Sequence, residues 1–366
     1  MEIPIFQNTP RAKHQVGRGP QRLNSENLEF NLSTLKKMLP DPNLVVENFT
    51  IGSRTQTKVS IVYLKDIVHQ GILQEVKTRL EKIHAEIILD SNFIEKNIQN
   101  FTWSPFPQVE KTNRPDVTIF ALNQGRIAIL VNGTPDTLLA PTTLFDILDT
   151  YDDSYHRWFV ASSFFRIARI ILLLIATFLP AFHISLTSYN PELIPTILSF
   201  NIIAARSSSP LPVYLETFIL IGIAEATRMV MLRFPTFIGQ TVALFAPISL
   251  VLTGLASNMF GAPLIIIVTL SIIATYTISD FDLRSSVRMI QFFTMLFSTF
   301  FGLFGLAMAF FYINIHLVTL KSFGVPYLAP LAPMNLSAWG HTILKEDTTD
   351  MPPDTTYKRK LGDNNE

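Results

Sequence analysis

The sequence contains no cysteine, and this absence excludes disulfide bonds, thiolate nucleophiles and cysteine metal sites. Its 29 basic residues are balanced by 29 acidic residues, so net charge gives no reason to expect a nucleic-acid partner. The seven histidines lack the spacing of metal ligands, and no glycine-rich phosphate loop is present. Without a nucleophile, a metal site or an acid–base cluster, the sequence predicts no enzyme and indicates no cofactor.

The N-terminus lacks the apolar core of a signal peptide. Residues 1–26 are polar and mildly basic, and we interpret them as a loose arm. We therefore expect the soluble part that follows to stay on the cytoplasmic side of a membrane, with the first span acting as an internal insertion signal.

Charge is scarce in one part of the chain. Only 16% of all residues are charged, against about 25% in a typical soluble domain. Residues 1–169 hold 37 charged residues, residues 170–344 hold 11, and residues 345–366 hold 10. This partition implies two solvents, water for the first part and a lipid bilayer for most of the second. It predicts a soluble N-terminal domain followed by an α-helical polytopic membrane domain.

The soluble part alternates strand and helix patterns. Val59–Leu64 is a β-branched run that predicts a buried strand, and Glu86–Leu89 has strand character again. Between them, apolar residues three and four positions apart over Leu73–Ile83 predict a helix with one apolar face. A second short helix is predicted from Ser91 to Ile98, with Ser91 as its cap.

A hairpin is predicted further along the soluble part. Val117–Leu122 and Arg126–Val131 have the pattern of strands, and Asn123-Gln124-Gly125 between them is a hairpin signal. Thr137–Ala140 suggests one more strand. Strands that alternate with helices and then pair predict a mixed α/β domain, which we place at residues 27–156.

Three long stretches without charge predict the membrane spans. Ile170–Pro191 has 22 residues, Phe234–Ser279 has 46 and Met289–Leu320 has 32. Because a span needs about 20 apolar residues, the first and third stretches hold one span each and the second holds two. The turn between those two falls at Asn258–Pro263. The sequence thus predicts four spans within a membrane domain at residues 157–320.

Residues 191–233 leave the count open at four or five spans. Leu193–Ala205 is too short to cross a bilayer upright, and Leu215–Leu232 is long enough but carries three charges. The segment is either a fifth span or part of a re-entrant helical hairpin.

The basic residues leave the side of the C-terminus open. Arg157, Arg166 and Arg169 place the start of the first span on the inner side. An even number of spans then places the polar C-terminal tail, residues 321–366, on the inner side too. An odd number instead places three other basic residues inside, namely Arg233, Arg284 and Arg288.

The charges within the apolar part are the candidate functional residues. A charge at mid-bilayer costs about 2.5–3.5 kcal/mol, so such residues normally face a water path or a partner. Glu225 and Arg228 are three residues apart on one helix face and can neutralise each other. Glu216, nine residues before Glu225, lies on the opposite face and needs its own environment. Either these residues line an ion or substrate path, or Glu225 and Arg228 form a structural pair with Glu216 at the surface.

Small residues also recur in the last apolar stretch. Gly302, Gly305 and Ala309 lie three and four positions apart and allow close helix contact, either within the chain or in an oligomer.

Short motifs follow one another in order along both parts of the chain. The soluble part carries Phe106-Pro107-Gln108, Arg114-Pro115-Asp116, Gly125-Arg126 before an apolar run, and Asp152–Trp158 before the first span. The membrane part carries Pro210-Leu211-Pro212 with Glu216, Glu225 with Arg228, Arg233-Phe234-Pro235, Gly239-Gln240-Thr241 and Ser322–Tyr327. This collinear set resembles the A subunit of the GerA-type spore germination receptors.

The resemblance implies a membrane subunit of a nutrient germinant receptor in the inner membrane of the endospore. It implies two partners, a B subunit that binds the germinant and a lipoprotein C subunit. It also implies that A subunits form a homo-oligomer in the lipid bilayer and contribute to a ligand-gated cation channel. Glu216, Glu225 and Arg228 are then the candidates for the ion path.

Departures from the family pattern keep an alternative open. Ile221 stands where the family has a glutamate and Met229 where it has an acidic residue, and Phe245–Ile248 replaces a glycine-rich stretch. A further acidic residue is missing from Thr253–Ser257, and the soluble subdomain that usually precedes this start is missing too. These changes favour, as the alternative, a non-conducting, diverged or truncated paralogue with a structural or assembly role. A secondary transporter that uses the broken helices near 191–233 is the third hypothesis.

Overall fold

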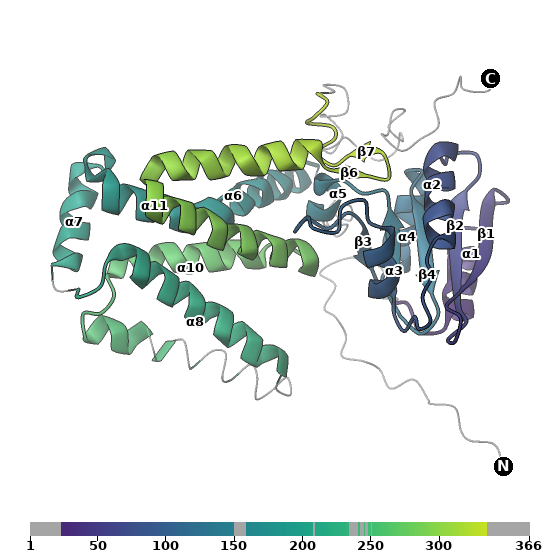
Figure 1. Cartoon of the computed structure of the whole chain (residues 1–366), viewed down its shortest axis with the longest axis horizontal. Helices are drawn as coiled ribbons and strands as arrows, with labels where there is room; N and C mark the ends of the chain where they lie inside the picture. Colours follow the sequence, from purple (N-terminus) through teal and green to yellow (C-terminus); the bar gives the residue numbers. More distant parts are fainter. Residues whose placement is uncertain are drawn as a thin grey trace, which may run out of the picture.

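The computed structural model describes residues 23–149, 159–207, 209–233 and 251–334, together with positions 241, 245, 248 and 249. These residues form two parts, an α/β domain and an elongated layer of helices that extends from it (Figure 1).

The arm predicted at residues 1–26 lies mostly outside the described residues, but its end is bound to the α/β domain. The Asn24 N–H donates to the Asn113 carbonyl at 2.8 Å, and the Glu26 carbonyl accepts from the Gly133 N–H at 2.9 Å. Residues 24 and 26 are therefore part of the domain.

The α/β domain is built on a five-stranded sheet in the order β1-β2-β4-β5-β3, and every neighbouring pair is antiparallel. Its strands are β1 (Leu44–Ile51), β2 (Thr57–Leu64), β3 (Glu110–Thr112), β4 (Ile127–Val131) and β5 (Thr137–Ala140). The strands predicted from the apolar runs at 59–64, 126–131 and 137–140 are confirmed as β2, β4 and β5.

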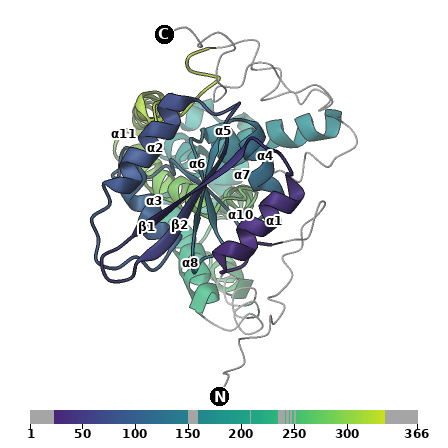
Figure 2. The same ribbon diagram turned by 90° about the vertical axis from the view of Figure 1, so that its right-hand side faces the viewer.

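Helices cover both faces of this sheet (Figure 2). On one face lie α1 (Leu28–Met38) and α4 (Pro115–Asn123), and on the other α2 (Gln70–Glu81) and α3 (Ser91–Ile98). Because side chains alternate along a strand, β4 contributes to two apolar clusters. Ile127, Ile129 and Val131 enter the α2–α3 cluster, whereas Ala128 and Leu130 enter the α1–α4 cluster. Burial on both faces explains why the strand has no polar residue.

One predicted strand is a helix. Val117–Leu122 lies inside α4, which begins with Pro115 in its first turn, where the missing N–H of proline costs nothing. Val117, Ala121 and Leu122 are buried against the sheet. A short, continuously apolar run is compatible with either conformation, so its pattern did not discriminate between them.

The predicted hairpin at Asn123-Gln124-Gly125 is instead the end of α4. Gly125 has a φ of 88°, which glycine adopts without strain, and the Arg126 N–H donates to the Ala121 carbonyl at 3.1 Å. The strand predicted at Glu86–Leu89 is also wrong. This segment crosses the β1–β2 turn, where the Glu86 carbonyl accepts from the Arg54 N–H at 3.0 Å.

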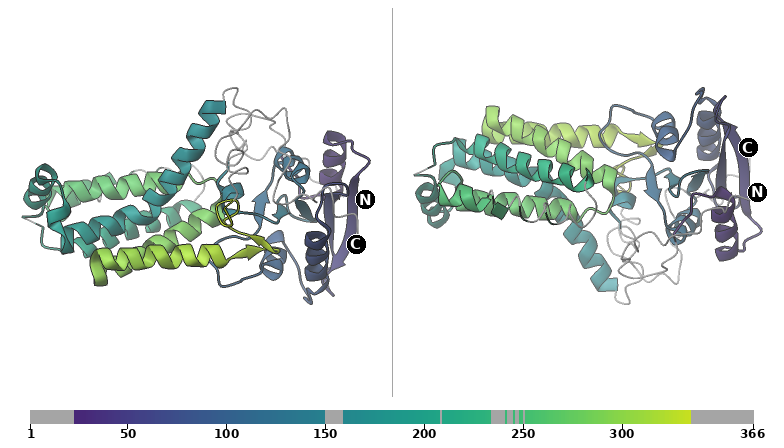
Figure 3. Two further views of the ribbon diagram at one scale, coloured as in Figure 1. Left: turned by 90° about the horizontal axis from the view of Figure 1, so that it is seen from above. Right: turned by 90° about the horizontal axis from the view of Figure 1, so that it is seen from below.

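The helices of the second part run between the α/β domain and the far end of the molecule (Figures 1 and 3). α6 (Phe159–Tyr189) starts near the domain, and a 3-10 turn (Pro191–Leu193) and α7 (Thr196–Arg206) follow at the far end. From there α8 (Val213–Arg233) and α10 (Ala262–Tyr276) run back toward the domain. The ambiguous segment 191–233 therefore consists of a short helix, α7, and a continuous 21-residue helix, α8.

The stretch expected to hold a single last span folds back on itself. α11 (Phe281–Thr319) contains Gly302 at φ 58° and ψ −139°, where the chain reverses. Phe293 and Tyr312 would be about 28 Å apart in a straight helix, yet their ring centroids are 5.7 Å apart. α11 is therefore a helical hairpin. We call residues 281–301 its first arm and residues 303–319 its second arm.

The small residues predicted as a contact stripe lie in this hairpin. Gly302 faces the Tyr189 ring at the end of α6, Gly305 packs against the backbone of Phe297 in the first arm, and Ala309 is fully buried. The stripe therefore makes close contacts within the chain.

Two of the described helices are long and apolar enough to cross a membrane, namely Ser163–Tyr189 and Phe281–Thr319. At 1.5 Å per residue, each arm of α11 is about 25–30 Å long, close to the thickness of a hydrocarbon core. The helices Thr196–Arg206 and Ala262–Tyr276 are apolar but shorter.

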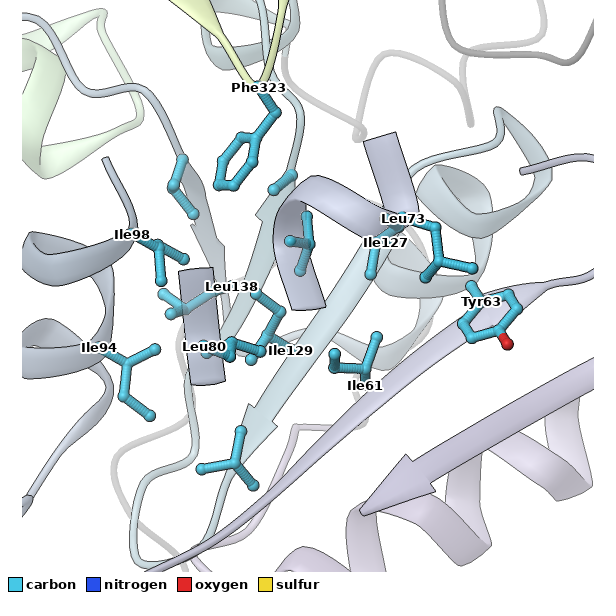
Figure 4. Close-up of a cluster of buried hydrophobic side chains, with 14 of the residues drawn as sticks. Ile61, Tyr63, Leu73, Leu80, Ile94, Ile98, Ile127, Ile129, Leu138 and Phe323 are labelled. Atoms are coloured by element: carbon cyan, nitrogen blue, oxygen red, sulfur yellow. The ribbon is translucent and has the colours of Figure 1, made fainter. Parts of the chain in front are cut away.

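Residues 321–334 do not belong to a polar tail. β6 (Lys321–Ser322) and β7 (Val325–Pro326) pair directly after α11, and Phe323 between them enters the α2–α3 cluster of the α/β domain (Figure 4). The chain thus returns to the domain that it left at α6. The rest of the predicted tail, residues 335–366, lies outside the described residues.

Candidate functional site

Glu225 is shared by two arginines. Arg228, one turn further along α8, places Nε and Nη2 each 2.9 Å from Glu225 Oε2, so the pair predicted from the spacing is confirmed. The other carboxylate oxygen, Oε1, lies 3.3 Å from Nε of Arg288 in the first arm of α11. Glu225 therefore ties α8 to α11 and has no surplus negative charge. The contact with Arg288, 63 positions away, could not be read from local spacing.

Glu216 lies in the first turn of α8, at the far end of the helical layer. Its side chain is 1% exposed and accepts a hydrogen bond from Ser209 Oγ, which also lies 3.3 Å from the Met259 carbonyl. Among the described residues it has no basic partner. The expectation that a structural Glu225–Arg228 pair leaves Glu216 at the surface is wrong. The N-terminal end of α8 helps to stabilise this buried carboxylate.

The candidate residues that follow α8 are not described at the level of side chains. Arg233 is the last residue of α8, and its side chain lies outside the described part. The predicted motif residues Pro235, Gly239 and Gln240, together with Asp152–Trp158, also lie outside the described residues.

The motif Arg114-Pro115-Asp116 starts helix α4. Pro115 occupies the first helical position, and Nη2 of Arg114 lies 2.7 Å from Asp116 Oδ2. The two charged side chains are 14% and 8% exposed. This ion pair joins the residue before α4 to its second residue, so the motif supports the start of the helix.

The motif Gly125-Arg126 joins α4 to β4. Arg126 is fully buried; its Nε donates to the Pro141 carbonyl at 2.8 Å, and its Nη2 lies 2.7 Å from Glu110 Oε2. Burial raises the pKa of Glu110 to about 7, although the attraction of Arg126 acts in the opposite direction. One buried guanidinium and one buried carboxylate thus link β3, β4 and the segment after β5.

Residues 104–111 form a joint between the two parts of the molecule, which the sequence analysis missed. The Pro105 carbonyl accepts a hydrogen bond from Ser286 Oγ in the first arm of α11. Ser104 Oγ lies 2.9 Å from His316 Nε2 in the second arm, and the Phe106 ring stacks on His316 with centroids 6.0 Å apart. Adjacent residues of one loop therefore contact both arms of the hairpin at their open ends.

Lys111 adds a charged link to this joint. Its Nζ lies 2.6 Å from Glu95 Oε2 in α3 and 2.7 Å from Asp282 Oδ2 at the start of α11. Burial lowers the pKa of Lys111, but the hydrogen bonds to Asp282 and Glu95 outweigh it and raise the pKa above its usual range. The charged form is therefore the one that connects the α/β domain to α11.

The segment Ser322–Tyr327 fastens the second arm to the domain. Ser322 Oγ donates to the Gln108 carbonyl at 2.7 Å and accepts from the Thr142 N–H at 3.1 Å. Phe323 points into the core beneath α2 and α3, as Figure 4 shows. Two motifs that lie more than 200 positions apart, Phe106-Pro107-Gln108 and Ser322–Tyr327, thus meet at the joint. Their order in the sequence carried no signal of this meeting.

These observations define a class of protein in which an α/β domain is bonded at several points to a layer of long apolar helices. The family model of the Bacillus/Clostridium GerA spore germination protein matches residues 8–355, and the chain belongs to this family. The resemblance expected from the motifs is therefore confirmed.

Curated relatives agree with this assignment. Spore germination protein GerLA of Bacillus cereus is 34% identical over 343 residues, which cover 94% of this chain and 68% of the relative. Spore germination protein KA of Bacillus subtilis (strain 168) is 35% identical over 318 residues, covering 87% and 58%. The uncharacterized membrane protein YfkQ of the same organism is 33% identical, covering 91% and 63%. The chain thus spans between 58% and 68% of the length of these relatives.

Among solved structures, the N-terminal domain of the A subunit of the Bacillus megaterium spore germinant receptor GerK3 is similar to this chain. The two are 37% identical in the aligned region, which covers 33% of this chain and 95% of that domain, with a TM-score of 0.28. At that TM-score the comparison carries no argument about the fold, which rests on the strands and helices described above.

Proposed function

We propose that the chain is a membrane subunit of a nutrient germinant receptor in the inner membrane of the endospore. Membership of the GerA family and the names of the relatives support this role. In this proposal it works with B and C subunits and with further copies of itself, and it is not an enzyme. Because the chain spans only part of the length of its relatives, the activity of the whole receptor is part of the proposal.

The helical layer is proposed to cross the bilayer an even number of times. α6 starts at the α/β domain, where Arg169 Nη1 donates to the Leu148 carbonyl at 3.0 Å. The second arm of α11 ends at the same domain, where His316 meets Ser104. A chain that leaves and returns on one side makes an even number of passes. This argument favours one side for both the α/β domain and the C-terminal segment, and it disfavours five spans. The basic residues before the first span, Arg157, Arg166 and Arg169, favour the inner side.

The single observation that carries a receptor-type role is the joint. Ser104 and Pro105 contact both arms of the α11 hairpin, so a displacement of the α/β domain by a partner changes the spacing of the arms. Gating is then a shift of population between two packings of the hairpin, biased by the partner that holds the germinant. In the leading form of the proposal, an oligomer of such subunits encloses a path for monovalent cations.

The ion-path candidates differ in how well they suit this role. Glu225 is neutralised by Arg228 and Arg288 and does not suit a cation. Glu216 keeps a carboxylate without a basic partner among the described residues, but it is buried within its own chain. It therefore contributes to a path only if the far end of α8 rearranges on opening.

The same observations favour a second candidate function. Closed contacts around both glutamates, together with Ile221 and Met229 at positions that are acidic in the family, suit a non-conducting paralogue with a structural role in assembly. A secondary transporter remains the third hypothesis, with the short helix α7 before α8 as its discontinuous element.

One reconstitution separates these functions. The chain is inserted into liposomes with B and C subunits, and release of a trapped monovalent cation is measured while a panel of amino acids and sugars is added. Flux that depends on one panel member, and that changes in Glu216→Gln, supports the channel subunit. Normal assembly without flux supports the paralogue, and uptake of a panel member by the isolated chain supports the transporter.

A further inference from the structure

Three arginines gather at the domain end of α8 and α11. Arg228 and Arg288 share the carboxylate of Glu225, and Arg284 lies one turn before Arg288 in the first arm, with its guanidinium 5.7 Å from the Tyr276 ring centroid. Arg284 donates to the Ile278 carbonyl at 3.0 Å and 2.6 Å, which supplies no compensating charge. Three positive side chains thus accompany one carboxylate.

The nearby acidic residues are engaged elsewhere. Asp280 accepts from the Leu283 N–H at 2.7 Å as the cap of α11, and Asp282 pairs with Lys111 of the α/β domain at 2.7 Å. Neither forms an ion pair with Arg284 or Arg288. Among the described residues, the cluster therefore keeps a positive charge of about two.

The cluster also has hydrogen-bond donors to spare. Arg228 directs Nε and Nη2 to one oxygen of Glu225, and Arg288 uses Nε for Glu225 and Nη2 for Ser285 Oγ at 3.0 Å. In the part of the chain that is described, both Nη1 groups lack a partner, and neither is sealed from the exterior. The side chains of Arg228 and Arg288 are 20% and 9% exposed, and their free donors match the oxygen atoms of a phosphate group.

The cluster lies at the depth of lipid headgroups if the helices span a bilayer as proposed above. Asp282 marks the level of the α/β domain. With a rise of 1.5 Å per residue, Arg284 lies about 3 Å and Arg288 about 9 Å further into the helical layer. The headgroup zone on one side of a bilayer is about 5–8 Å thick, so Arg284 lies within it. Arg288 lies just below it, and its long side chain reaches back toward the N-terminal end of the arm to phosphate level.

We propose that Arg228, Arg284 and Arg288 form a binding site for a phosphate oxyanion, presented by the headgroup of an anionic membrane lipid. Basic pockets between helices on the inner side of a membrane bind such headgroups. The phosphate supplies the negative charge that Glu225 alone does not, and it completes the link between α8 and α11. The proposal depends on the membrane placement in the proposed function and not on conduction.

The test is lipid retention by the full chain in nanodiscs of phosphatidylcholine with a minor fraction of phosphatidylglycerol. After extraction into mild detergent, the bound lipids are counted by mass spectrometry. We expect phosphatidylglycerol to be enriched over its bulk fraction, and enrichment to fall about fivefold for each arginine removed in Arg284→Gln and Arg288→Gln. Arg54→Gln, which removes a surface charge of the α/β domain, is the matched control and keeps the enrichment.

A second variant should change phosphatidylglycerol retention in the opposite direction. Glu225→Gln removes the competing carboxylate and should increase phosphatidylglycerol retention, provided that the variant elutes as folded protein.

Competition with inorganic phosphate at constant ionic strength separates the two sources of phosphate. Displacement of the lipid assigns the site to soluble phosphate, and no displacement assigns it to the headgroup. Equal retention of both lipids by the wild-type chain, or unchanged enrichment in the arginine variants, overturns the proposal. Because no flux is measured, these outcomes are independent of the channel function.

Discussion

The two parts of the molecule hold their buried charges in different ways. In the α/β domain, the guanidinium of Arg126 has a carboxylate of its own, Glu110, and the pair is neutral when Glu110 is ionised. In the helical layer, the carboxylate of Glu225 serves both Arg228 and Arg288. The first arrangement is closed, and the second is open to a further anion. Charge balance therefore distinguishes a pair that supports the fold from a cluster that is suited to binding.

The apolar side chains of the two parts differ in whether they face the interior or the exterior of the molecule. The core strands of the α/β domain are buried on both faces, as β4 illustrates. In α11 the large apolar side chains point outward, and Phe300, Phe304 and Phe311 are 67%, 69% and 65% exposed. Contiguous apolar surface of this kind needs lipid or another subunit as its solvent. The same residue types thus stabilise one part from within and suit the other to an apolar exterior.

We expect the largest effect from a substitution that breaks the buried Arg126–Glu110 pair of the α/β domain. Arg126→Leu leaves Glu110 buried without its partner, and we expect the free energy of unfolding to fall by about 3–5 kcal/mol at about pH 8. The measurement is denaturant or thermal unfolding of the full chain in detergent. Arg54→Leu is the control, because its pair with Glu86 is 73% and 67% exposed and contributes about 0–1 kcal/mol. Equal stability of the two variants would show that the buried pair does not hold the domain.

The pH dependence of the α/β domain should follow from the same pair. The pKa of Glu110 is raised by burial to about 7 in the folded chain, from a reference value of 4.5. The folded state therefore holds this proton more tightly than the unfolded state does. The stabilisation is present below about pH 4.5 and is lost as the pH rises through about 7, and it amounts to at most about 3 kcal/mol.

The measurement is the unfolding temperature between about pH 5 and pH 8. We expect the wild-type chain to lose stability over this range and Glu110→Gln to flatten the profile, with Glu86→Gln as an exposed control. The pKa of Glu47 is lowered in the folded state, and its contribution is lost as the pH falls below about 4.5, outside this window. A wild-type stability that rises from pH 5 to pH 8 would contradict the expected sign.

The helical part is expected to be most sensitive at the reversal of α11. Gly302→Ala places a side chain at φ 58° and toward the Tyr189 ring, and it should cost about 1–3 kcal/mol for the backbone alone. Gly222→Ala in α8, where a new Cβ meets nothing within 4 Å, is the matched control. The readout is thermal unfolding in the same detergent.

The absence of native cysteine permits a direct test of the hairpin itself. Phe293→Cys with Tyr312→Cys should cross-link with a short bifunctional reagent, because the two rings are 5.7 Å apart. Phe281→Cys with Phe301→Cys has a similar separation in sequence but lies within one arm, about 30 Å apart, and should not react. Cross-linking of both pairs, or of neither, would disagree with the reversal at Gly302.

Sequence patterns predicted the parts of the fold that depend on local periodicity. β2, β4 and β5 were found from apolar runs, α2 and α3 from spacing of three and four, and the Glu225–Arg228 pair from one helical turn. Val117–Leu122 was misassigned because a buried helix and a buried strand are both continuously apolar. α1 and β1 were missed because exposed polar residues interrupt their apolar pattern, and β3 because its three residues, Glu110–Thr112, are all polar.

The contacts that define the candidate sites join residues far apart in the sequence, through the reversal of α11 or the packing of its first arm, and could not be predicted. The length of Met289–Leu320 is compatible with one long span, and a single residue, Gly302, turns it into two arms. That turn brings His316 to Ser104, 212 positions away, and the packing of the first arm on α8 places Arg288 beside Glu225. Long-range partners of this kind leave no trace in spacing or composition.

The smallest expected effect tests whether the joint couples the two parts. Ser104→Ala removes the contact to the second arm and Ser286→Ala the contact to the first, and each should cost about 1 kcal/mol. Hydrogen exchange of the full chain should then show faster opening of residues 104–111 together with the ends of α11. Ser33→Ala removes a hydroxyl that bonds within α1 and is the control.

If one loop couples both arms, the effects in the double variant are less than additive, because the first substitution already frees the loop. Strict additivity would mean that the two arms respond to the α/β domain separately, and the joint would then not transmit a single movement to the hairpin.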